Sequence, residues 1–249
     1  MTKKIALVTG GSRGIGAATA QLLAQQGIQV VINYQKNQLA AEQITDSIIA
    51  QGYQAIAIQA DVSQEEQVVE LFKQIDVLDG KLTMLVNNAG ILMQQSPVSE
   101  LTAERINKIL SNNVTSYFLC CREAIKRMSP NNGGQGGAIV NVSSAASRLG
   151  APNEYVDYAA SKGAIDSLTK GLSLEVAAEN IRVNSVRPGF IYTEMHADGG
   201  EANRVERVKE NIPMKRGGQP IEVAQAITWL LSEQASYVTG SHIELAGGK

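Results

Sequence analysis

The sequence predicts an α/β fold: a doubly wound, Rossmann-type parallel sheet of seven strands with helices on both faces, in a single domain over residues 1–249. Three observations predict it. Short apolar runs alternate with stretches of helical periodicity along the chain, which is typical of parallel strands joined by right-handed crossovers. The runs are apolar nearly throughout, as strands are when helices cover both faces of a sheet. The length suits one large α/β domain.

The elements of the first half alternate regularly, and glycines end the first two helices. Gly27 and Gly52 stand just past these helices, where a left-handed residue commonly ends a helix. Ser63, followed by Glu66, predicts a capping box at the start of a third helix. The expected strands are residues 4–9, 29–33, 53–59 and 81–87, and the first two helices are residues 15–26 and 37–51.

The second half continues the alternation but contains one long segment without a strand pattern. This segment, residues 190–216, is expected to cover the substrate, with Met195 and His196 near the pocket. The expected helices are residues 103–128, 158–178 and 220–231, and the expected strands are residues 137–142, 181–187 and 242–245.

Charge and hydropathy exclude several classes of function. The formal net charge is −2, without a basic block, which argues against nucleic acid or an anionic membrane as the main partner. The longest apolar runs, such as residues 5–8, are far shorter than the roughly 18 residues that a membrane span needs. The first residues carry too short an apolar stretch for a signal peptide. We therefore expect a cytoplasmic protein.

The cysteines and histidines predict neither a disulfide nor a metal site. Cys120 and Cys121 are neighbours, and neighbours in a helix point in different directions, so we expect two reduced, apolar side chains. The only histidines are His196 and His242, and no Cys/His spacing is typical of a metal site.

A glycine-rich turn, Thr9–Gly16, follows the first strand and precedes the first helix. Glycines let the backbone approach a pyrophosphate, and the helix N-terminus attracts the anion. The spacing is Gly-x-x-x-Gly-x-Gly rather than the common Gly-x-Gly-x-x-Gly, but its place between a strand and a helix favours nucleotide binding. The residues expected to hold the cofactor here are Gly10, Ser12, Arg13, Gly14, Ile15 and Gly16.

The end of the second strand predicts the choice of cofactor. Enzymes that use NAD often carry an acidic side chain there, which binds the ribose 2′-hydroxyl. This chain has Asn33, Tyr34 and Lys36 and no acid. Arg13 and Lys36 would attract a 2′-phosphate, so we expect NADP (NADPH), with NAD possible.

Tyr158 and Lys162 stand four residues apart in an expected helix and therefore share one face. A tyrosine has an ordinary pKa of about 10, which is too high for efficient proton transfer near neutrality. An ammonium about 4 Å away would stabilise the phenolate by roughly 4 kcal/mol at an effective dielectric constant of about 20. We therefore expect the pKa of Tyr158 to lie about 2–3 below its ordinary value.

Taken together, these motifs and others in the chain resemble the short-chain dehydrogenase/reductase family. The resemblance covers essentially the whole chain, and it is closest to carrier-linked 3-oxoacyl reductases and glucose dehydrogenases. The motifs occur in the family's order: Thr9–Gly16, Asp61–Val62, Asn87–Gly90, Asn113, Ser143–Ser144, Tyr158–Lys162, Arg187–Gly189 and Tyr237–Gly240.

The resemblance implies four catalytic residues. Tyr158 would be the general acid in carbonyl reduction and the base in the reverse reaction. Lys162 would lower its pKa and bind the nicotinamide ribose. Ser144, rather than Ser143, would hold the substrate oxygen. Asn113, rather than Asn112, would anchor a proton-relay water near Lys162.

The resemblance also adds residues to the expected cofactor site and distinguishes the catalytic Tyr158 from the nearby Tyr155. Tyr155 has Ala159 instead of a lysine four residues on, so it is not expected to act in catalysis. Ser144 stands one residue further from Tyr158 than in many members, which suggests an altered substrate wall at residues 152–156. The added cofactor residues are Asp61 and Val62 at the adenine, Asn88, Ala89 and Gly90 along the adenosine ribose, and Pro188, Gly189, Ile191 and Thr193 beside the nicotinamide and pyrophosphate.

The expected partner is a small-molecule carbonyl or alcohol, and two alternatives remain. A 3-oxoacyl-[acyl-carrier-protein] reductase would need a basic docking patch, for which Lys126 and Arg127 are candidates, although the loop at residues 131–137 is uncharged. A non-catalytic nucleotide-binding scaffold is the second alternative, since fold does not imply activity. Outward apolar residues of the two long helices, such as Phe118, Leu168 and Leu172, and the resemblance itself predict a homotetramer.

Overall fold

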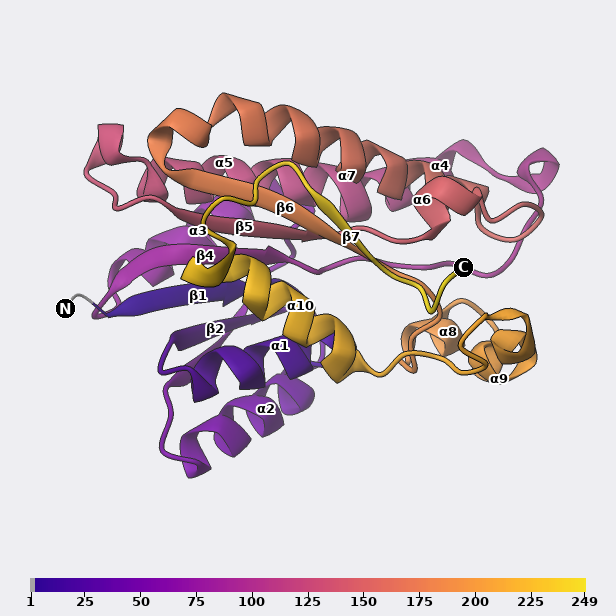
Figure 1. Ribbon diagram of the computed structural model, residues 1–249, viewed down its shortest axis with the longest axis horizontal. Coiled ribbons are helices and arrows are strands. Elements are labelled where there is room, and N and C mark those ends of the chain that lie inside the picture. The colour runs from indigo at the N-terminus through magenta and orange to yellow at the C-terminus, as the bar shows by residue number, and fades with distance from the viewer. Residues whose placement is uncertain (1–2) are drawn as a thin grey trace.

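The computed structural model describes residues 3–249, which contain one parallel sheet of seven strands in the order β3-β2-β1-β4-β5-β6-β7. Figure 1 shows this sheet between two layers of helices. The strands are β1 (Lys4–Val8), β2 (Gln29–Tyr34), β3 (Ala55–Gln59), β4 (Lys81–Asn87), β5 (Gly137–Val142), β6 (Ile181–Pro188) and β7 (His242–Leu245). The predicted doubly wound fold is confirmed.

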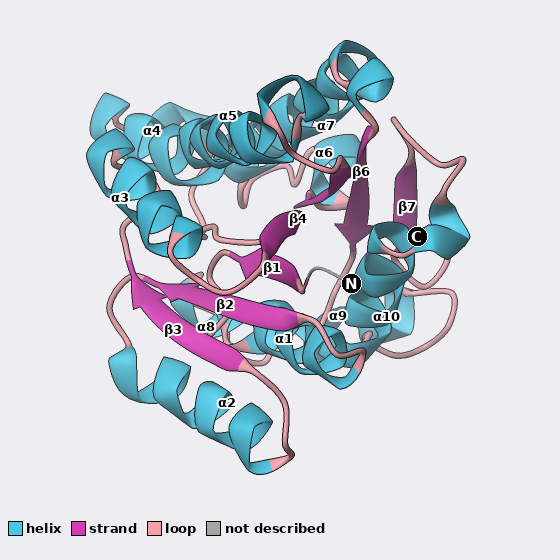
Figure 2. Cartoon of the chain, turned by 90° about the vertical axis from the view of Figure 1, so that its left-hand side faces the viewer, coloured by secondary structure: helices cyan, strands magenta, loops and turns pink. Residues whose placement is uncertain are grey.

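Helices cover both faces of the sheet, and short helices lie beyond the carboxyl ends of its strands (Figure 2). One layer consists of α1 (Gly14–Gln25), α2 (Gln38–Ala50) and α10 (Pro220–Leu231). The other consists of α3 (Glu65–Asp76), α4 (Ala103–Leu110), α5 (Ser116–Met128) and α7 (Val156–Glu175). The short helices are α6 (Ala146–Leu149), α8 (Met195–Asp198) and α9 (Arg204–Val208).

Two apolar cores, one on each face of the sheet, hold the layers together. Successive side chains of a strand point to opposite faces, so Leu7 and Val8 of β1 enter different cores. Val8 packs in the core that contains Leu23 of α1, and Leu7 in the core that contains Phe72 of α3. Because both faces are buried, the strands need apolar residues at nearly every position.

The strand order reverses at β1, which pairs with β2 on one side and β4 on the other. Crossovers leave in opposite directions from this point, so a crevice opens beyond the carboxyl ends of β1 and β4. Asn88, which follows β4, closes its base: its side-chain Nδ2 donates to the carbonyl oxygens of Thr9 (2.9 Å) and Gly10 (3.0 Å).

The predicted helix over residues 103–128 is interrupted, so that prediction is wrong in its middle. A π turn, Ser111–Thr115, separates α4 from α5. A π turn takes in an extra residue and rotates the side chains that follow it, and such turns are frequent at functional sites. The pattern of apolar residues alone did not reveal this interruption.

One further prediction, the capping box at Ser63, needs correction. The third helix begins at Glu65 with Gln64 as its N-cap, and Ser63 forms no capping box, because its backbone nitrogen and hydroxyl both donate to Asp61 Oδ1 (3.0 and 2.7 Å). The segment at residues 190–216, for which the sequence predicted no strand, contains α8 and α9, and its Ile191 forms an isolated bridge with Gly218.

Cys120 and Cys121 are both buried and free. Within residues 3–249, every helix is too short or too polar to cross a membrane.

Candidate active site

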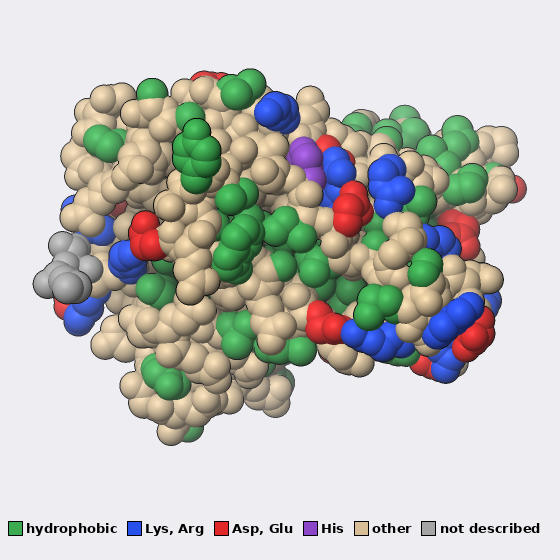
Figure 3. All heavy atoms as spheres, in the orientation of Figure 1, with side chains coloured by type: hydrophobic (Ala, Val, Ile, Leu, Met, Phe, Trp, Pro, Cys, Tyr) green, Lys and Arg blue, Asp and Glu red, His purple; other side chains and the backbone are tan. Residues whose placement is uncertain are grey.

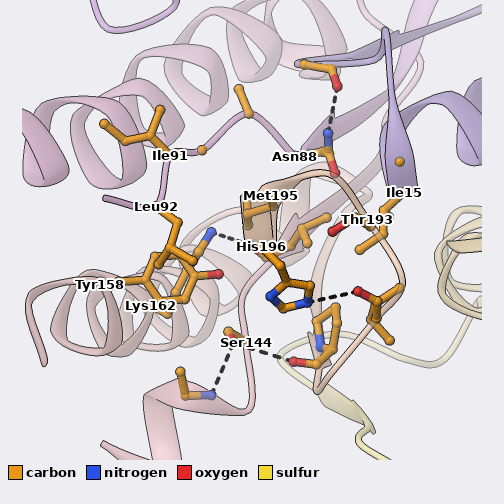
Figure 4. A pocket seen from close by; sticks show the side chains of 18 of the residues that line it. Ile15, Asn88, Ile91, Leu92, Ser144, Tyr158, Lys162, Thr193, Met195 and His196 are labelled. Atoms are coloured by element: carbon orange, nitrogen blue, oxygen red, sulfur yellow. Dashed lines mark hydrogen bonds between the residues drawn. The ribbon is translucent and has the colours of Figure 1, made fainter. Parts of the chain in front are cut away.

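A cavity of about 750 Å³ lies beyond the carboxyl ends of the strands, between the glycine-rich turn and the segment that carries α8 and α9. Figure 4 shows its interior, where Tyr158, Lys162, Ser144 and His196 face a common space. Residues from the first turn, from the loops after β2, β4, β5 and β6, and from the start of α7 meet there. The topology therefore brings together motifs that are far apart in the chain.

The glycine-rich turn is shaped for close approach of a ligand. Gly14 has φ +52°, a left-handed backbone that favours glycine. A Cβ on Gly16 would lie 2.6 Å from both Asn88 Nδ2 and the Gly10 carbonyl oxygen, so a side chain has no room. The backbone of α1 thus begins directly beneath the cavity, as pyrophosphate binding requires.

The loop after β2 lines the cavity without an acidic side chain. The lining residues here are Asn33 and Tyr34 at the end of β2, followed by Gln35, Lys36 and Asn37 of the loop. Asn33 is 2% exposed, and its side chain is used inside the protein: Nδ2 donates to Ala60 O (3.0 Å), and Oδ1 accepts from Gly10 N (3.4 Å). Asn33 therefore shapes the turn, and a direct side-chain contact with a cofactor is left to its neighbours.

Arg13, which immediately precedes α1, reaches across the mouth of the cavity. Its Nη2 pairs with the Asp198 carboxylate at the end of α8, and both side chains are about half exposed. The guanidinium thus links the glycine-rich turn to the segment that covers the cavity.

Tyr158 and Lys162 lie on the first turns of α7 and face the cavity together (Figure 4). Lys162 Nζ is 5.7 Å from the centre of the Tyr158 ring. It donates to Val142 O (2.8 Å) and to the Tyr117 hydroxyl (3.2 Å), which itself donates to Val142 O (3.0 Å). The end of β5 therefore fixes the position of the ammonium.

Burial dominates the acid–base chemistry of this pair. It raises the pKa of Tyr158 to about 12, with the Ser144 hydrogen bond opposing it, and it lowers the pKa of Lys162 to about 7, with Asp166 opposing it. The expectation that Lys162 lowers the pKa of Tyr158 is wrong for the protein alone. Desolvation disfavours the charged form of each side chain and is the largest cause of both shifts.

Asn113 occupies the centre of the π turn and is fully buried. Its Oδ1 accepts from Ile91 N (2.8 Å), and its Nδ2 donates to Ile91 O (3.0 Å) and to Ser161 Oγ (3.3 Å). A Cβ on Gly90 would lie 3.3 Å from Asn113 Oδ1 and 3.7 Å from Lys162 Nζ. Asn113 thus lies behind the cavity, close to Lys162, and holds the loop after β4.

The two adjacent serines have different surroundings. Ser143 is 2% exposed and its hydroxyl donates to Lys162 O (3.1 Å), so it anchors α7. Ser144 has its hydroxyl at the cavity, where it accepts from Ala146 N (3.1 Å) and donates weakly to Pro188 O (3.4 Å). Ser144 is the serine available to a substrate oxygen.

Most residues that the sequence singled out line this cavity. Gly16 and Asn113 do not, because one lies under the turn and the other behind Gly90. The residues that line it as expected are Gly10, Ser12, Arg13, Gly14, Ile15, Asn33, Tyr34, Lys36, Asp61, Val62, Asn88, Ala89, Gly90, Ser144, Tyr158, Lys162, Pro188, Gly189, Ile191 and Thr193.

Tyr155 and Tyr117 have roles that the sequence did not show in full. Tyr155 is buried and its hydroxyl donates to Gly199 O (3.0 Å), which agrees with its exclusion from catalysis. Tyr117, which bonds Lys162, was missed. It stands four residues after Asn113, and this helical spacing was the available clue. Arg204 was also missed, since only the fold carries it to the cavity.

Comparison with known proteins gives consistent results. A family described as Enoyl-(Acyl carrier protein) reductase matches residues 10–249. The uncharacterized oxidoreductase YgfF of Escherichia coli (strain K12) is 70% identical over 98% of this chain and 99% of its own length. Glucose 1-dehydrogenase 2 of Bacillus subtilis (strain 168) is 37% identical over 100% of this chain and 95% of its own length.

A third relative and a solved structure agree with them. The 3-oxoacyl-[acyl-carrier-protein] reductase of Synechocystis sp. is 37% identical over 100% of this chain and 97% of its own length. The structure of a mutant short-chain dehydrogenase/reductase of Serratia marcescens superposes with a TM-score of 0.90 at 33% identity, over 99% of this chain and 98% of that one. The chain is therefore an oxidoreductase of the short-chain dehydrogenase/reductase family.

Proposed function

We propose that the protein is an NADP-dependent oxidoreductase that transfers a hydride between a nicotinamide and a small carbonyl or alcohol, with Tyr158 as the general acid and base. The observation that carries the proposal is the convergence of Tyr158, Lys162 and Ser144 in one cavity with the glycine-rich turn. An inert nucleotide-binding scaffold would not need this arrangement.

The residues at the turn fit a dinucleotide phosphate. Gly14 lines the cavity where α1 begins, and Gly16 lets the turn pack closely against Asn88, so the N-terminus of α1 lies where it could bind a pyrophosphate. The loop after β2 offers Lys36 and no carboxylate to a 2′-phosphate, and Arg13 lies at the same mouth. When bound, the nicotinamide would supply or accept the hydride.

Tyr158 would deliver the proton. With a pKa of about 12 in the protein alone, the phenol holds its proton near neutral pH, which is the form that carbonyl reduction uses. A bound cofactor would have to lower this pKa for the proton transfer to be efficient. Ser144 would hold the carbonyl oxygen of the substrate by a hydrogen bond. Alcohol oxidation would need the phenolate instead.

Carrier-protein-linked 3-oxoacyl reduction is less well supported, although relatives bear that name. The candidate basic patch is already neutralised. Lys126 pairs with Glu123 (2.8 Å), and Arg127 pairs with Asp76 (2.6 Å) and Glu123 (3.0 Å). Little free positive charge remains at this place to attract an acidic carrier, so we favour a free small substrate.

The test is the turnover of NADPH with a carbonyl panel by the wild type, Tyr158→Phe and Tyr155→Phe. General acid/base groups contribute about 10²–10⁴ in rate, and Tyr158→Phe should lose an amount toward the upper end of this range. Tyr155→Phe is the matched control and should lose far less. Fluorescence should show nearly unchanged NADPH binding by both variants. Retention of more than about a tenth of wild-type turnover by Tyr158→Phe would refute the assignment.

A further inference from the structure

The substrate end of the cavity is mostly apolar, and two residues of its wall each carry a buried polar atom without a hydrogen-bond partner. Its walls include Leu92, Leu149, Pro152, Phe190 and Met195. Among the described residues, Arg204 Nη1 and His196 Nδ1 are buried and unpaired. A buried polar group without a partner costs about 1–3 kcal/mol, so each such atom calls for a partner that the protein alone does not supply, such as a ligand or a water.

Arg204, on α9, is held rigidly in the wall. It is 7% exposed, and its guanidinium lies 4.6 Å from the centre of the Tyr155 ring and 5.5 Å from that of Phe190. Its Nη2 donates to Glu154. Its Nη1 has only Glu201 nearby, at 3.8 Å, which is beyond hydrogen-bond distance. One nitrogen thus keeps its capacity to donate while the rest of the group is fixed.

His196, on α8, supplies the complementary atom. Its Nε2 lies 3.0 Å from the Ile191 carbonyl oxygen, which can only accept, so this nitrogen carries the hydrogen. Burial and the nearby Arg204 charge lower the pKa of His196, so the ring is neutral and Nδ1 is an acceptor. In Figure 4 this free nitrogen is on the side of the ring toward Tyr158.

A donor and an acceptor in one wall match a hydroxyl group, which both accepts and donates. An anion fits less well for two reasons. The lone pair of the neutral His196 would repel it, and the carboxylates of Glu154 and Glu201 already offset the charge of Arg204. A purely apolar substrate would leave both atoms unpaired.

Building on the proposed function, we propose that Arg204 and His196 select a carbonyl substrate that bears a hydroxyl group, as sugars and hydroxyketones do. The hydroxyl accepts from Arg204 Nη1 and donates to His196 Nδ1. Because solvent does not reach either atom, the segment that carries α8 and α9 must shift slightly to admit the hydroxyl.

The experiment compares matched substrates. Ketones of increasing chain length are used, each as the hydroxyketone, its deoxy counterpart and the keto acid; the shortest set is 4-hydroxy-2-butanone, 2-butanone and acetoacetate. We expect the wild type with NADPH to prefer the hydroxyketone at the best chain length by at least about tenfold in kcat/KM, since sites built for a hydroxyl reject analogues that lack it.

The variant His196→Phe keeps a ring of similar size but removes the acceptor Nδ1, together with the Nε2–H that donates to the Ile191 carbonyl oxygen. It should reduce about tenfold the ratio of kcat/KM for the hydroxyketone to kcat/KM for the deoxy ketone; the ratio is compared because a general effect on turnover cancels in it. His242→Phe is the matched control, because His242 lies outside this cavity and bonds Ser185 (2.6 Å). Arg204→Gln keeps a donor and should retain more of the preference than Arg204→Met.

Calorimetry with the Tyr158→Phe variant measures the binding affinity of the same ketones in the absence of turnover. A ranking led by the hydroxyketone, and abolished when His196→Phe is added, supports the proposal even if the Arg204 variants fail to fold. Equal binding of deoxy and hydroxylated ketones, or a preference for the keto acid, would overturn it. Wild-type turnover of the deoxy ketones as fast as of the hydroxyketones would overturn this inference alone. A fully active Tyr158→Phe would overturn the proposed function instead.

Discussion

At the residue scale, Lys162 combines near-complete burial with a position at the centre of the site. It is 3% exposed, and its pKa falls to about 7 because burial disfavours the ammonium. Its two hydrogen bonds, to Val142 O and Tyr117, hold the side chain in place without supplying a negative charge. The residue is therefore positioned for function at a cost to stability.

This cost predicts a pH dependence of unfolding. The unfolded chain holds a proton on Lys162 up to about pH 10.4, whereas the folded chain releases it near pH 7. Between these values the unfolded state binds more protons, so the contribution of Lys162 to stability rises with pH. Lys162→Met should remove the change of unfolding free energy with pH that Lys162 causes. The Val142 carbonyl oxygen would still accept a hydrogen bond from the Tyr117 hydroxyl in this variant.

Urea unfolding of the wild type and Lys162→Met at a series of pH values measures the effect. The free energy of unfolding of Lys162→Met should exceed that of the wild type by the largest amount at or below pH 7, and this difference should shrink toward pH 10. A difference that is constant across this window would show that Lys162 titrates normally in the folded chain.

At the element scale, an ion pair joins the glycine-rich turn, which is the proposed cofactor site, to α8 in the segment that covers the cavity. Arg13 pairs with Asp198 of α8, yet Arg13 is also the proposed contact for a 2′-phosphate. A phosphate would compete with the Asp198 carboxylate for the same guanidinium. Because the pair is about half exposed, its contribution is small, at most about 1 kcal/mol.

Two variants test this relation. Wild-type protein should bind NADPH at least about tenfold more tightly than NADH, and Arg13→Ala should erase much of the difference. Asp198→Asn should tighten NADPH binding up to about fivefold and leave NADH binding unchanged, because only the phosphate needs the released Arg13. Asp79→Asn, which removes an ion pair with Lys3 that contains no cavity residue, is the control. Equal wild-type affinities for NADH and NADPH would contradict the cofactor assignment.

At the scale of the whole molecule, apolar and charged surfaces are separated. Figure 3 shows hydrophobic side chains along the middle of one face and interleaved charges over the end that carries α8 and α9. On the α4–α5 and α7 side, Phe118 is 52% and Leu174 is 69% exposed. Leu168 and Leu172, which the sequence also placed outward, are half-buried. Exposed large apolar residues on two neighbouring helices suit a helix-bundle interface.

We therefore predict a homotetramer. Light scattering at micromolar concentration should give about four times the chain mass of 26.6 kDa. Phe118→Asp should lower the mass, because a charge in an apolar interface is costly to desolvate. Glu175→Ala, an exposed change near Leu174 that removes a charge, should leave it unchanged. A monomer mass for the wild type would refute the prediction.

The sequence by itself determined the strands, the two layers of helices and most of the cavity lining, because apolar periodicity and glycine-rich turns are local properties of the chain. Only the tertiary structure decided the π turn at Asn113, the Tyr117 contact with Lys162, and the arrival of Arg204 at the substrate end. It also reversed the expected pKa shift of Tyr158. Burial and long-range contacts are set when distant segments pack together, and no local pattern records how much water that packing excludes.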